Sequence, residues 1–256
     1  MQILLACAKI MNTPSPSTIA RGREGVTLPR FDQEANTIAA EMGRHDVESL
    51  MEMFHCSRHI ALDNKLRYQH FFDDEQRMPA LAAYYGQAYK CLQAQTLGDD
   101  AWHYGQQHLW MTSFLYGLLR PMDAIHAYRM EGNVRLETTH GQTLFDYWKP
   151  RLTSVLIQAV KEDDGVLVHL ATEEMEHLFD WKQVTAAVRV IQPKFLVMKD
   201  GKPKTVTVYA KSCRGAMTRY LLQQRCRQVA DLHGFEYQGF CFADGWGDED
   251  HPHYIL

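Results

Sequence analysis

The chain has 256 residues, of which 46% are hydrophobic and 23% charged, proportions typical of a globular protein with a substantial core. Its net charge is −4, so binding to nucleic acid or to a membrane would need a local basic patch. The six cysteines form no Cys-x-x-Cys pair, which favours reduced thiols in a cytoplasmic protein. No apolar run approaches the ~18 residues of a membrane span, and the short apolar start lacks the basic residues of a signal peptide.

Strand-like and helix-like segments alternate along the chain, which predicts an α/β fold of mixed α+β type. We expect a single compact domain over residues 1–256, with a mixed central sheet, an antiparallel hairpin and flanking helices. In the N-terminal half the predicted segments are a strand over residues 2–8, a loop over 12–29, helices over 33–42, from 46 to about 56 and over 58–72 (interrupted near Asp63), a strand over 79–85 and a helix ending near 108.

The C-terminal half begins with a buried run over residues 109–119, which fits a strand or a short buried helix. Asp200 and Gly201 form the centre of a predicted hairpin turn. The other predicted segments are a helix over 142–160 broken or kinked at Pro150, strands over 166–171 and 186–197, a strand over 205–210 that returns from the hairpin, a helix over 213–229 that Ser212 caps, a strand over 239–242 and a flexible acidic tail.

Residues 201–230 carry seven lysines and arginines and no acid, an asymmetry that a chain of net negative charge makes notable. Lys211, Arg214 and Arg219 surround the expected start of a helix. Free N–H groups and the positive end of the helix dipole at that start suit a phosphate or carboxylate. The alternative is a solvated helix face.

The turn between the first two predicted helices holds Gly43, Arg44 and His45. A tight turn between helices, here over about residues 33–56, can present backbone N–H groups to a DNA phosphate, as in a helix-hairpin-helix element. Two packed core helices joined by a short loop have the same sequence pattern, so this alternative stays open.

Metal binding and cysteine chemistry have weaker signals. Glu-x-x-His occurs at Glu52–His55, Glu137–His140 and Glu174–His177, a pattern used by di-iron proteins when the pairs face one another. The glutamates that such a bundle also needs are not evident, so no metal and no cofactor are expected. Cys7 lies at the end of the first predicted strand, near Lys9, and an inert buried thiol is the favoured interpretation.

The buried run over residues 109–119 ends in a charged segment. Arg120 and Asp123 flank Pro121, and Arg129 and Glu131 follow shortly after. The alternatives are a charged solvent turn and a segment that carries site residues.

The same residues carry a family resemblance: the chain resembles the YaaA family of bacterial peroxide stress proteins. Leu115 to Pro121, combined with Tyr209 to Lys211 and the following Arg214, is the specific part of the match. The remaining matches, in family order, are Ala8, Lys9, Gly86, Tyr89, Gln107, His108, Leu109, Asp123, Tyr128, Arg129, Glu131, Trp148, Leu170, Ala171, Glu174, Gly215, Met217, Arg219, Gly234, Phe235 and Gly239.

The resemblance implies one α/β domain with a basic cleft, a helix-hairpin-helix element that binds DNA, and a cytoplasmic role in the hydrogen peroxide response linked to lowering free iron. It implies that Gly43 to Asp46 form the hairpin and that six basic residues line the cleft. Asp123 and Glu131 would be cleft acids of undetermined role. The six basic residues are Lys9, Arg120, Arg129, Lys211, Arg214 and Arg219.

This chain departs from the family pattern at Ala6 and Cys7, where the family has Ser-Pro, and at Gln87 and His169. Because the basic positions survive better than these polar ones, binding of DNA or another phosphate-bearing ligand is the first hypothesis. The second is an enzyme that acts on a nucleotide or modified base, with Lys9 or Glu131 as acid or base. The third is an iron-binding protein that uses the Glu-x-x-His pairs.

Overall fold

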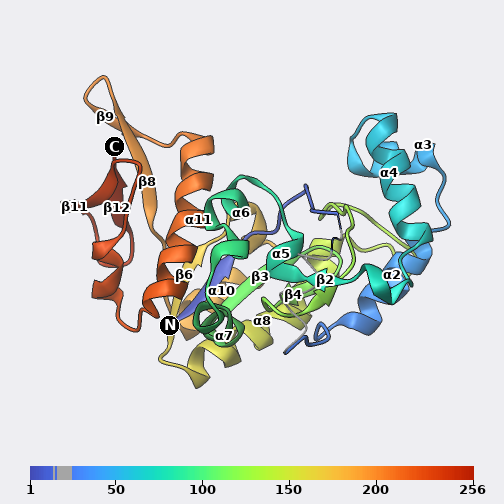
Figure 1. Cartoon of the computed structure of the whole chain (residues 1–256), viewed down its shortest axis with the longest axis horizontal. Helices are drawn as coiled ribbons and strands as arrows, with labels where there is room; N and C mark the ends of the chain where they lie inside the picture. Colours follow the sequence, from blue (N-terminus) through green and yellow to red (C-terminus); the bar gives the residue numbers. More distant parts are fainter. Residues whose placement is uncertain (14, 16–24) are drawn as a thin grey trace.

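The structure is a computed structural model that describes residues 1–13, 15 and 25–256. Part of the loop predicted over residues 12–29 therefore lies outside the described residues. The described residues form two five-stranded sheets, a small two-stranded sheet and surrounding helices. This confirms the predicted mixed α/β fold class (Figure 1).

The central sheet has the strand order β4-β3-β1-β6-β7. Its parallel strands pair in the order β3, β1, β6, β7, and β4 is antiparallel to β3, so the predicted mixed central sheet is confirmed. Every residue of β1 is buried, as expected for a strand between parallel neighbours. The strands are β1 (Gln2–Leu5), β3 (Leu109–Ser113), β4 (Gly117–Leu119), β6 (Val166–Leu170) and β7 (Arg189–Ile191).

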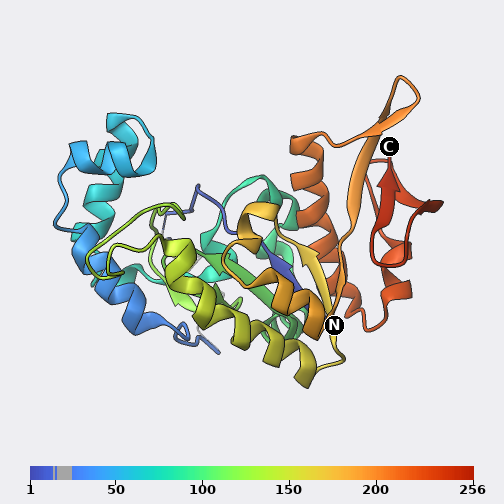
Figure 2. The same cartoon turned by 180° about the vertical axis from the view of Figure 1, so that it is seen from behind.

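Helices cover both faces of this sheet. Helix α8 (Leu144–Glu162) and α10 (Trp181–Ala187) lie on one face, and α6 (Gln87–Leu92), α7 (Asp99–His108) and α11 (Thr207–Gln224) lie on the other (Figures 1 and 2). Pro150 lies inside α8 without ending it, so the expected break is wrong. The short helix α9 (Glu173–Glu176) follows β6.

The second sheet has the order β10-β11-β12-β8-β9. The predicted hairpin is confirmed between β8 and β9, with positive φ angles of 53° at Asp200 and 71° at Gly201. The flexible tail was a wrong expectation, because Tyr254 is fully buried against Phe195 and Phe235. The strands are β8 (Lys194–Lys199), β9 (Lys202–Lys204), β10 (Glu236–Tyr237), β11 (Phe240–Gly247) and β12 (Pro252–Ile255).

Several segment boundaries differ from the sequence predictions. The strand expected over residues 205–210 is wrong: β9 ends at Lys204, and α11 begins at Thr207. The alternation of valine with threonine there does not mark a buried face: Val208 and Tyr209 are exposed, and only Ala210 of this stretch is buried. The predicted helix over 213–229 accordingly starts earlier and ends at Gln224. The expected strand over 186–197 is split between β7 and β8, which belong to different sheets.

The strand expected over residues 79–85 is largely wrong as well. Only Met78–Pro79 forms a strand, β2, which pairs with β5 (Ala124–Ile125), and the next four residues form the helical turn α5 (Ala80–Ala83). Alanine has the highest helix propensity, and three of these four residues are alanine. The run over 109–119 forms β3 and β4, so the strand interpretation holds.

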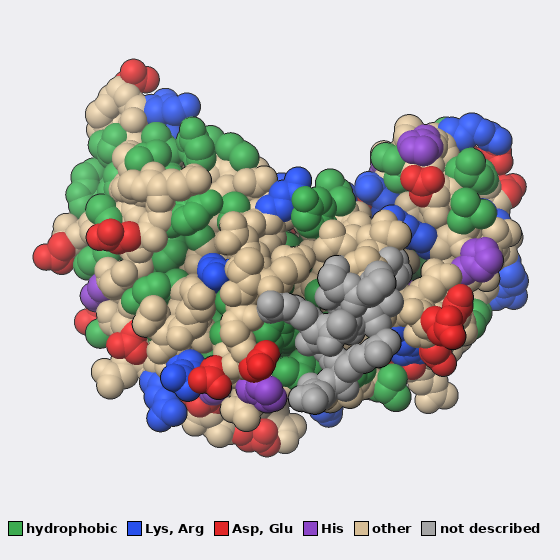
Figure 3. All heavy atoms as spheres, in the orientation of Figure 1, with side chains coloured by type: hydrophobic (Ala, Val, Ile, Leu, Met, Phe, Trp, Pro, Cys, Tyr) green, Lys and Arg blue, Asp and Glu red, His purple; other side chains and the backbone are tan. Residues whose placement is uncertain are grey.

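Three helices form a lobe at one end of the molecule. They are α2 (Asp32–Met42), α3 (Val47–Phe54) and α4 (Arg58–Gln69), and α4 continues through Asp63 without the expected interruption. The second sheet stands at the opposite end, and the surface between the two lobes is concave (Figure 3). None of the helices among the described residues has the length and apolar character that a membrane crossing requires.

Candidate functional site

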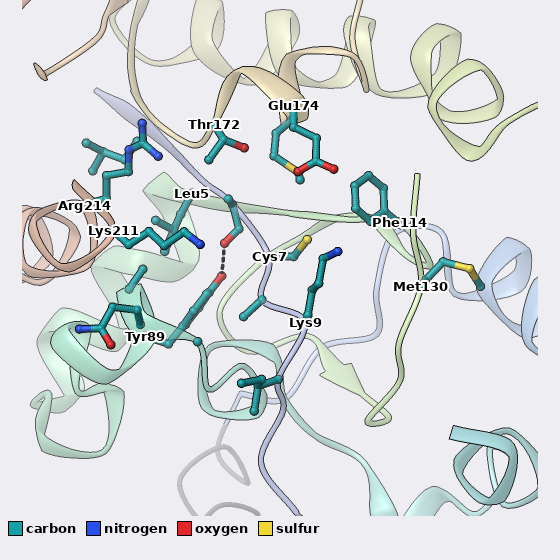
Figure 4. Close-up of a pocket in the computed structure, with 18 of the residues that line it drawn as sticks. Leu5, Cys7, Lys9, Tyr89, Phe114, Met130, Thr172, Glu174, Lys211 and Arg214 are labelled. Atoms are coloured by element: carbon teal, nitrogen blue, oxygen red, sulfur yellow. Dashed lines mark hydrogen bonds between the residues drawn. The ribbon is translucent and has the colours of Figure 1, made fainter. Parts of the chain in front are cut away.

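A cavity of about 330 Å³ lies at the carboxyl ends of β1 and β6. After β1 the chain forms β3 and β4 on one side of that strand, and it later forms β6 and β7 on the other side. Such a switch point between parallel strands is where open α/β sheets commonly bind their ligands. Its walls come from the segment after β1, from the start of α6, from α9 and from the first half of α11 (Figure 4).

Two cations project from α11 into this cavity (Figure 4). Lys211 and Arg214 are three residues apart, which places them on one face of the helix. Burial lowers the pKa of the Arg214 guanidinium, and Glu173 opposes this shift only through space. No hydrogen bond or ion pair joins either cation to another described residue, in contrast to Arg77, which pairs with Asp32 and Asp74.

The opposite side of the cavity holds a chain of ion pairs. Lys9 Nζ lies 2.6 Å from one carboxylate oxygen of Glu131, and Arg129 Nη2 lies 3.0 Å from the other. Lys9 and Arg129 line the cavity, and Glu131 lies just behind them. The Nε of Arg129 is buried and has no hydrogen-bond partner among the described residues. Glu131 therefore orients both cations.

Between these two groups lie a thiol, a hydroxyl and a carboxylate. Burial raises the pKa of the Cys7 thiol to about 12, and Glu174 and Glu131 raise it further, so Cys7 is no activated nucleophile. Thr172 Oγ1 is buried without a partner among the described residues. Although Thr172 occupies the N-cap position of α9, its side chain makes no capping bond.

Neither Thr172 nor Glu174 was among the predicted site residues, and Glu174 entered only as half of a Glu-x-x-His pair and as a match to the family pattern. Both follow directly after β6. The position of polar residues at the carboxyl end of a buried parallel strand is a signal that could have identified them. Phe114 and Met130 also line the cavity, but apolar lining residues have no sequence pattern that separates them from core residues.

The expectation that Arg120 and Asp123 line the cleft is corrected. Arg120 stacks on Trp110, with its guanidinium 4.1 Å from the ring centre, and its Nε donates to the carbonyl oxygen of Gln106. Asp123 is buried and accepts hydrogen bonds from the Arg120 N–H and the Thr27 hydroxyl. Neither residue lines the cavity, because the turn after β4 folds back onto the core.

Arg219 is also outside the cavity. Its guanidinium donates to the carbonyl oxygens of Leu92 and Gln93 and to the Thr96 hydroxyl, so it caps the end of α6. The expected helix start at Ser212 is wrong, because α11 already begins at Thr207. Ser212 lies inside this helix, and its hydroxyl donates to the Val208 carbonyl oxygen. The cations of α11 therefore act as side chains and not together with a helix N-terminus.

The turn with Gly43, Arg44 and His45 lies in the helical lobe. Lys65 Nζ donates to the carbonyl oxygens of Gly43 and His45. The backbone N–H groups of all three turn residues donate to carbonyl oxygens of α2, and Asp46 caps α3. This turn offers a phosphate the exposed side chain of Arg44 and not free backbone N–H groups. The closely packed helix pair of the lobe is α3 and α4.

The three Glu-x-x-His pairs do not come together. Among the described residues there is no group of three or more histidine, cysteine, aspartate or glutamate side chains placed to hold a metal ion. Glu174 faces the cavity, whereas His177 packs against Phe145. The acidic residues near the C-terminus instead pair with Arg189 through Glu249 and Asp250.

Comparison with known proteins identifies the family. The family model described as peroxide stress protein YaaA matches residues 1–245. The chain belongs to this family. A UPF0246 protein of Bacteroides fragilis is 45% identical over 97% of this chain and 96% of its own length. A UPF0246 protein of Porphyromonas gingivalis is 42% identical over the full length of both chains, and one of Dinoroseobacter shibae is 38% identical over 90% and 87%.

The positions at which this chain departs from the YaaA pattern are built into or beside the cavity wall. The Ala6 carbonyl oxygen accepts a hydrogen bond from Tyr89, and Gln87 donates to Ser212 Oγ at 2.9 Å. His169 lies behind the wall and is 2.9 Å from Glu176. These residues link the segments that form the cavity, which gives the substitutions a structural role in this family member.

Proposed function

We propose that this protein, a member of a peroxide stress family, is a cytoplasmic protein that binds DNA, or another ligand that bears phosphate, in the cavity between β1, β6 and α11. The observation that carries the proposal is the pair Lys211 and Arg214. Lys211 is exposed, whereas Arg214 is partly buried and has no carboxylate partner among the described residues, which is unfavourable in the isolated protein. An anionic ligand would supply the missing partner, and arginine suits phosphate because its planar fork donates two parallel hydrogen bonds.

The shape of the surface supports DNA over a small anion. Lysine and arginine atoms lie on the floor of the concave face between the lobes, and others lie on the helical lobe (Figure 3). A concave, basic surface allows contacts to several phosphates along a backbone, and these contacts supply most of the affinity in sequence-independent binding. Because the net charge of the chain is negative, attraction of DNA depends on the lysine and arginine side chains of this surface and not on the charge of the whole protein.

The test is duplex DNA binding, measured by fluorescence anisotropy across a salt series. Affinity should fall steeply as salt rises. Arg214→Gln and Lys211→Gln should each weaken binding to all sequences by roughly five- to tenfold and lower the salt slope by about one. Arg225→Gln is the matched control, because Arg225 lies at the other end of the same helix and pairs only weakly with Asp100, at 3.5 Å.

Two results would contradict the proposal. The first is the absence of duplex binding at low salt, about 50 mM. The second is an equal effect of Arg225→Gln and Arg214→Gln, which would indicate a response to net charge and not to the cavity. Protection against Fenton damage and a lower level of free iron are the cellular outcomes that we connect with this binding. The proposal assigns neither outcome to a metal site in this chain.

A second candidate function is an enzyme that acts on a nucleotide or modified base. The specific observation in its favour is the pair Lys9 and Glu131, which meets the cavity opposite Glu174. Proton transfer requires such groups within hydrogen-bond reach of the reacting atom. Incubation with nucleotides and modified bases, followed by chromatography, tests it: product formed by the wild type and lost in Glu131→Gln supports catalysis, and unchanged substrates count against it.

A further inference from the structure

The cavity has more apolar surface than a phosphate site needs. Leu5, Phe114, Met130, Leu170 and Met175 line it together with the cations. Two cations on an exposed helix face would be enough to hold a phosphate of a DNA backbone that passes over the surface. The cavity as a whole, at about 330 Å³ and with apolar walls behind these cations, lies instead within the size range of sites that enclose a small organic group.

The cations without a partner among the described residues and the aromatic ring of Phe114 lie at different ends of the cavity. Lys211 and Arg214 approach from α11 on one side, whereas Phe114 and Met130 lie on the other, with Cys7 between them (Figure 4). At the Phe114 side the two cations, Lys9 and Arg129, already share the Glu131 carboxylate as a partner. A ligand that fits this arrangement is anionic at one end and flat and largely apolar at the other.

The polar groups in the recess are few and specific. Thr172 Oγ1 is buried and has no hydrogen-bond partner among the described residues, and the same is true of Arg129 Nε. Buried polar atoms are nearly always hydrogen-bonded in folded proteins, so each such atom at a cavity wall requires an explanation. Thr172 lies on the Arg214 side of the cavity (Figure 4), so a phosphate or sugar oxygen of a ligand would accept a hydrogen bond from its hydroxyl.

We propose that the cavity accepts one nucleotide of DNA that has been turned out of the base stack. This inference rests on the proposed binding of DNA. The phosphate of that nucleotide lies against Lys211 and Arg214, and its base enters the recess beside Phe114 and Met130. A paired and stacked base cannot reach the recess, because α6, α9 and α11 enclose it on separate sides; extrusion of the nucleotide is the way in which proteins enclose a single base of DNA.

The test uses duplex DNA with a single 2-aminopurine placed opposite a mismatched base. The fluorescence of 2-aminopurine is quenched by stacking, so its extrusion by the wild-type protein should raise the emission about threefold. The affinity for the same duplex is measured by anisotropy in parallel. The wild-type comparison requires no variant and therefore does not depend on the stability of one.

A variant pair then locates the effect. Cys7→Phe fills the recess between Lys9 and Glu174 and should abolish the emission rise. Cys241→Phe makes the same substitution at an exposed cysteine of β11 and should leave the rise unchanged. Thermal unfolding of both variants checks that they are folded.

The outcomes separate this inference from the proposed function. Absence of duplex binding overturns both. Duplex binding by anisotropy without a rise in emission overturns the inference alone, as does a rise that persists in folded Cys7→Phe. The inference is also overturned if the protein binds free 2-aminopurine deoxyriboside monophosphate but binds the duplex without a rise in emission. The site would then bind free nucleotides and not a nucleotide of the duplex. A rise lost only in Cys7→Phe supports extrusion into this cavity.

Discussion

Gly215 of α11 packs directly on the backbone of Ala88 in α6. A Cβ atom at position 215 would overlap the carbonyl group of Ala88, so only glycine permits the two helices to approach this closely. The contact lies one residue after Arg214 and one residue after Gln87, both of which line the cavity. The distance between the helices therefore sets the width of the cavity.

Gly215→Ala should destabilise the protein by about 2 kcal/mol or more, because the neighbouring atom is backbone and cannot rotate away. Urea unfolding measures the change. Gly105→Ala is the matched control: Gly105 also lies in a helix, and a Cβ there meets carbon atoms of Leu222 and Pro121 at an ordinary 3.4 Å. Because alanine has a higher helix propensity than glycine, Gly105→Ala should be roughly 0.5 kcal/mol more stable than the wild type. A neutral Gly215→Ala would contradict the close packing.

Arg219→Gln should reduce stability and leave DNA affinity unchanged. The guanidinium makes three hydrogen bonds at the end of α6, and the loss of such bonds costs about 1–2 kcal/mol. Anisotropy and thermal unfolding are measured on the same preparation. If Arg219→Gln instead had normal stability and weakened DNA binding, Arg219 would belong to the binding surface.

Asp123 should make stability rise as the solution becomes more acidic. Burial raises the pKa of this carboxyl in the folded state, although the Arg120 N–H and Thr27 hydroxyl oppose the shift. The folded state then holds the proton more tightly than the unfolded state, so stability increases as pH falls through the raised pKa toward about 3.9.

The Asp123 effect is measured as the difference from Asp123→Asn in urea unfolding between about pH 4 and pH 7. The difference should shift in favour of the wild type as pH falls, because asparagine cannot ionise. Asp123→Ala should show the same pH trend and in addition lose about 2 kcal/mol, since it leaves two donors without an acceptor. A difference that shifts the other way would show that the hydrogen bonds outweigh burial.

His169 should act in the opposite direction. Burial lowers its pKa, Glu176 opposes the shift, and the charges of Arg214 and Lys194 reinforce it. Below about pH 6.5 the unfolded state takes up a proton that the folded state resists, so stability falls until the lowered pKa is reached. His169→Gln should lose this part of the pH dependence. His59→Gln, at an exposed position of α4, should retain it, and equal profiles for the two variants would contradict the assignment.

Arg44 tests whether the helical lobe contacts DNA. Its backbone N–H donates to Glu41 of α2, so only its side chain is available. Arg44→Gln should weaken duplex binding a few-fold and lower the salt slope by about one. Lys161→Gln removes one exposed charge near the end of α8 and serves as the control. An unchanged slope for Arg44→Gln would place the DNA on the floor of the concave face and away from this lobe.

Secondary structure was predicted correctly from the sequence where residues within one segment determine it. The buried run of β1 and the Asp200–Gly201 turn have local causes, namely apolar continuity and a backbone that tolerates positive φ. Residues 205–210 were predicted wrongly because their alternating pattern is not matched by alternating burial. In the first turn of α11 Val208 and Tyr209 are exposed, and only Ala210 is buried.

The candidate site divides in the same way. The sequence by itself determined the family and the supply of cations, because the motif around Leu115 to Pro121 and the acid-free stretch over residues 201–230 are visible without a structure. Only the tertiary structure decided which cations lack partners. Arg120 and Arg219 are bound by carbonyl oxygens, and Lys211 and Arg214 are not. The physical reason is that a side chain forms a hydrogen bond only with a group that lies next to it in the folded protein. These neighbours come from distant segments of the chain, and no local sequence pattern identifies them.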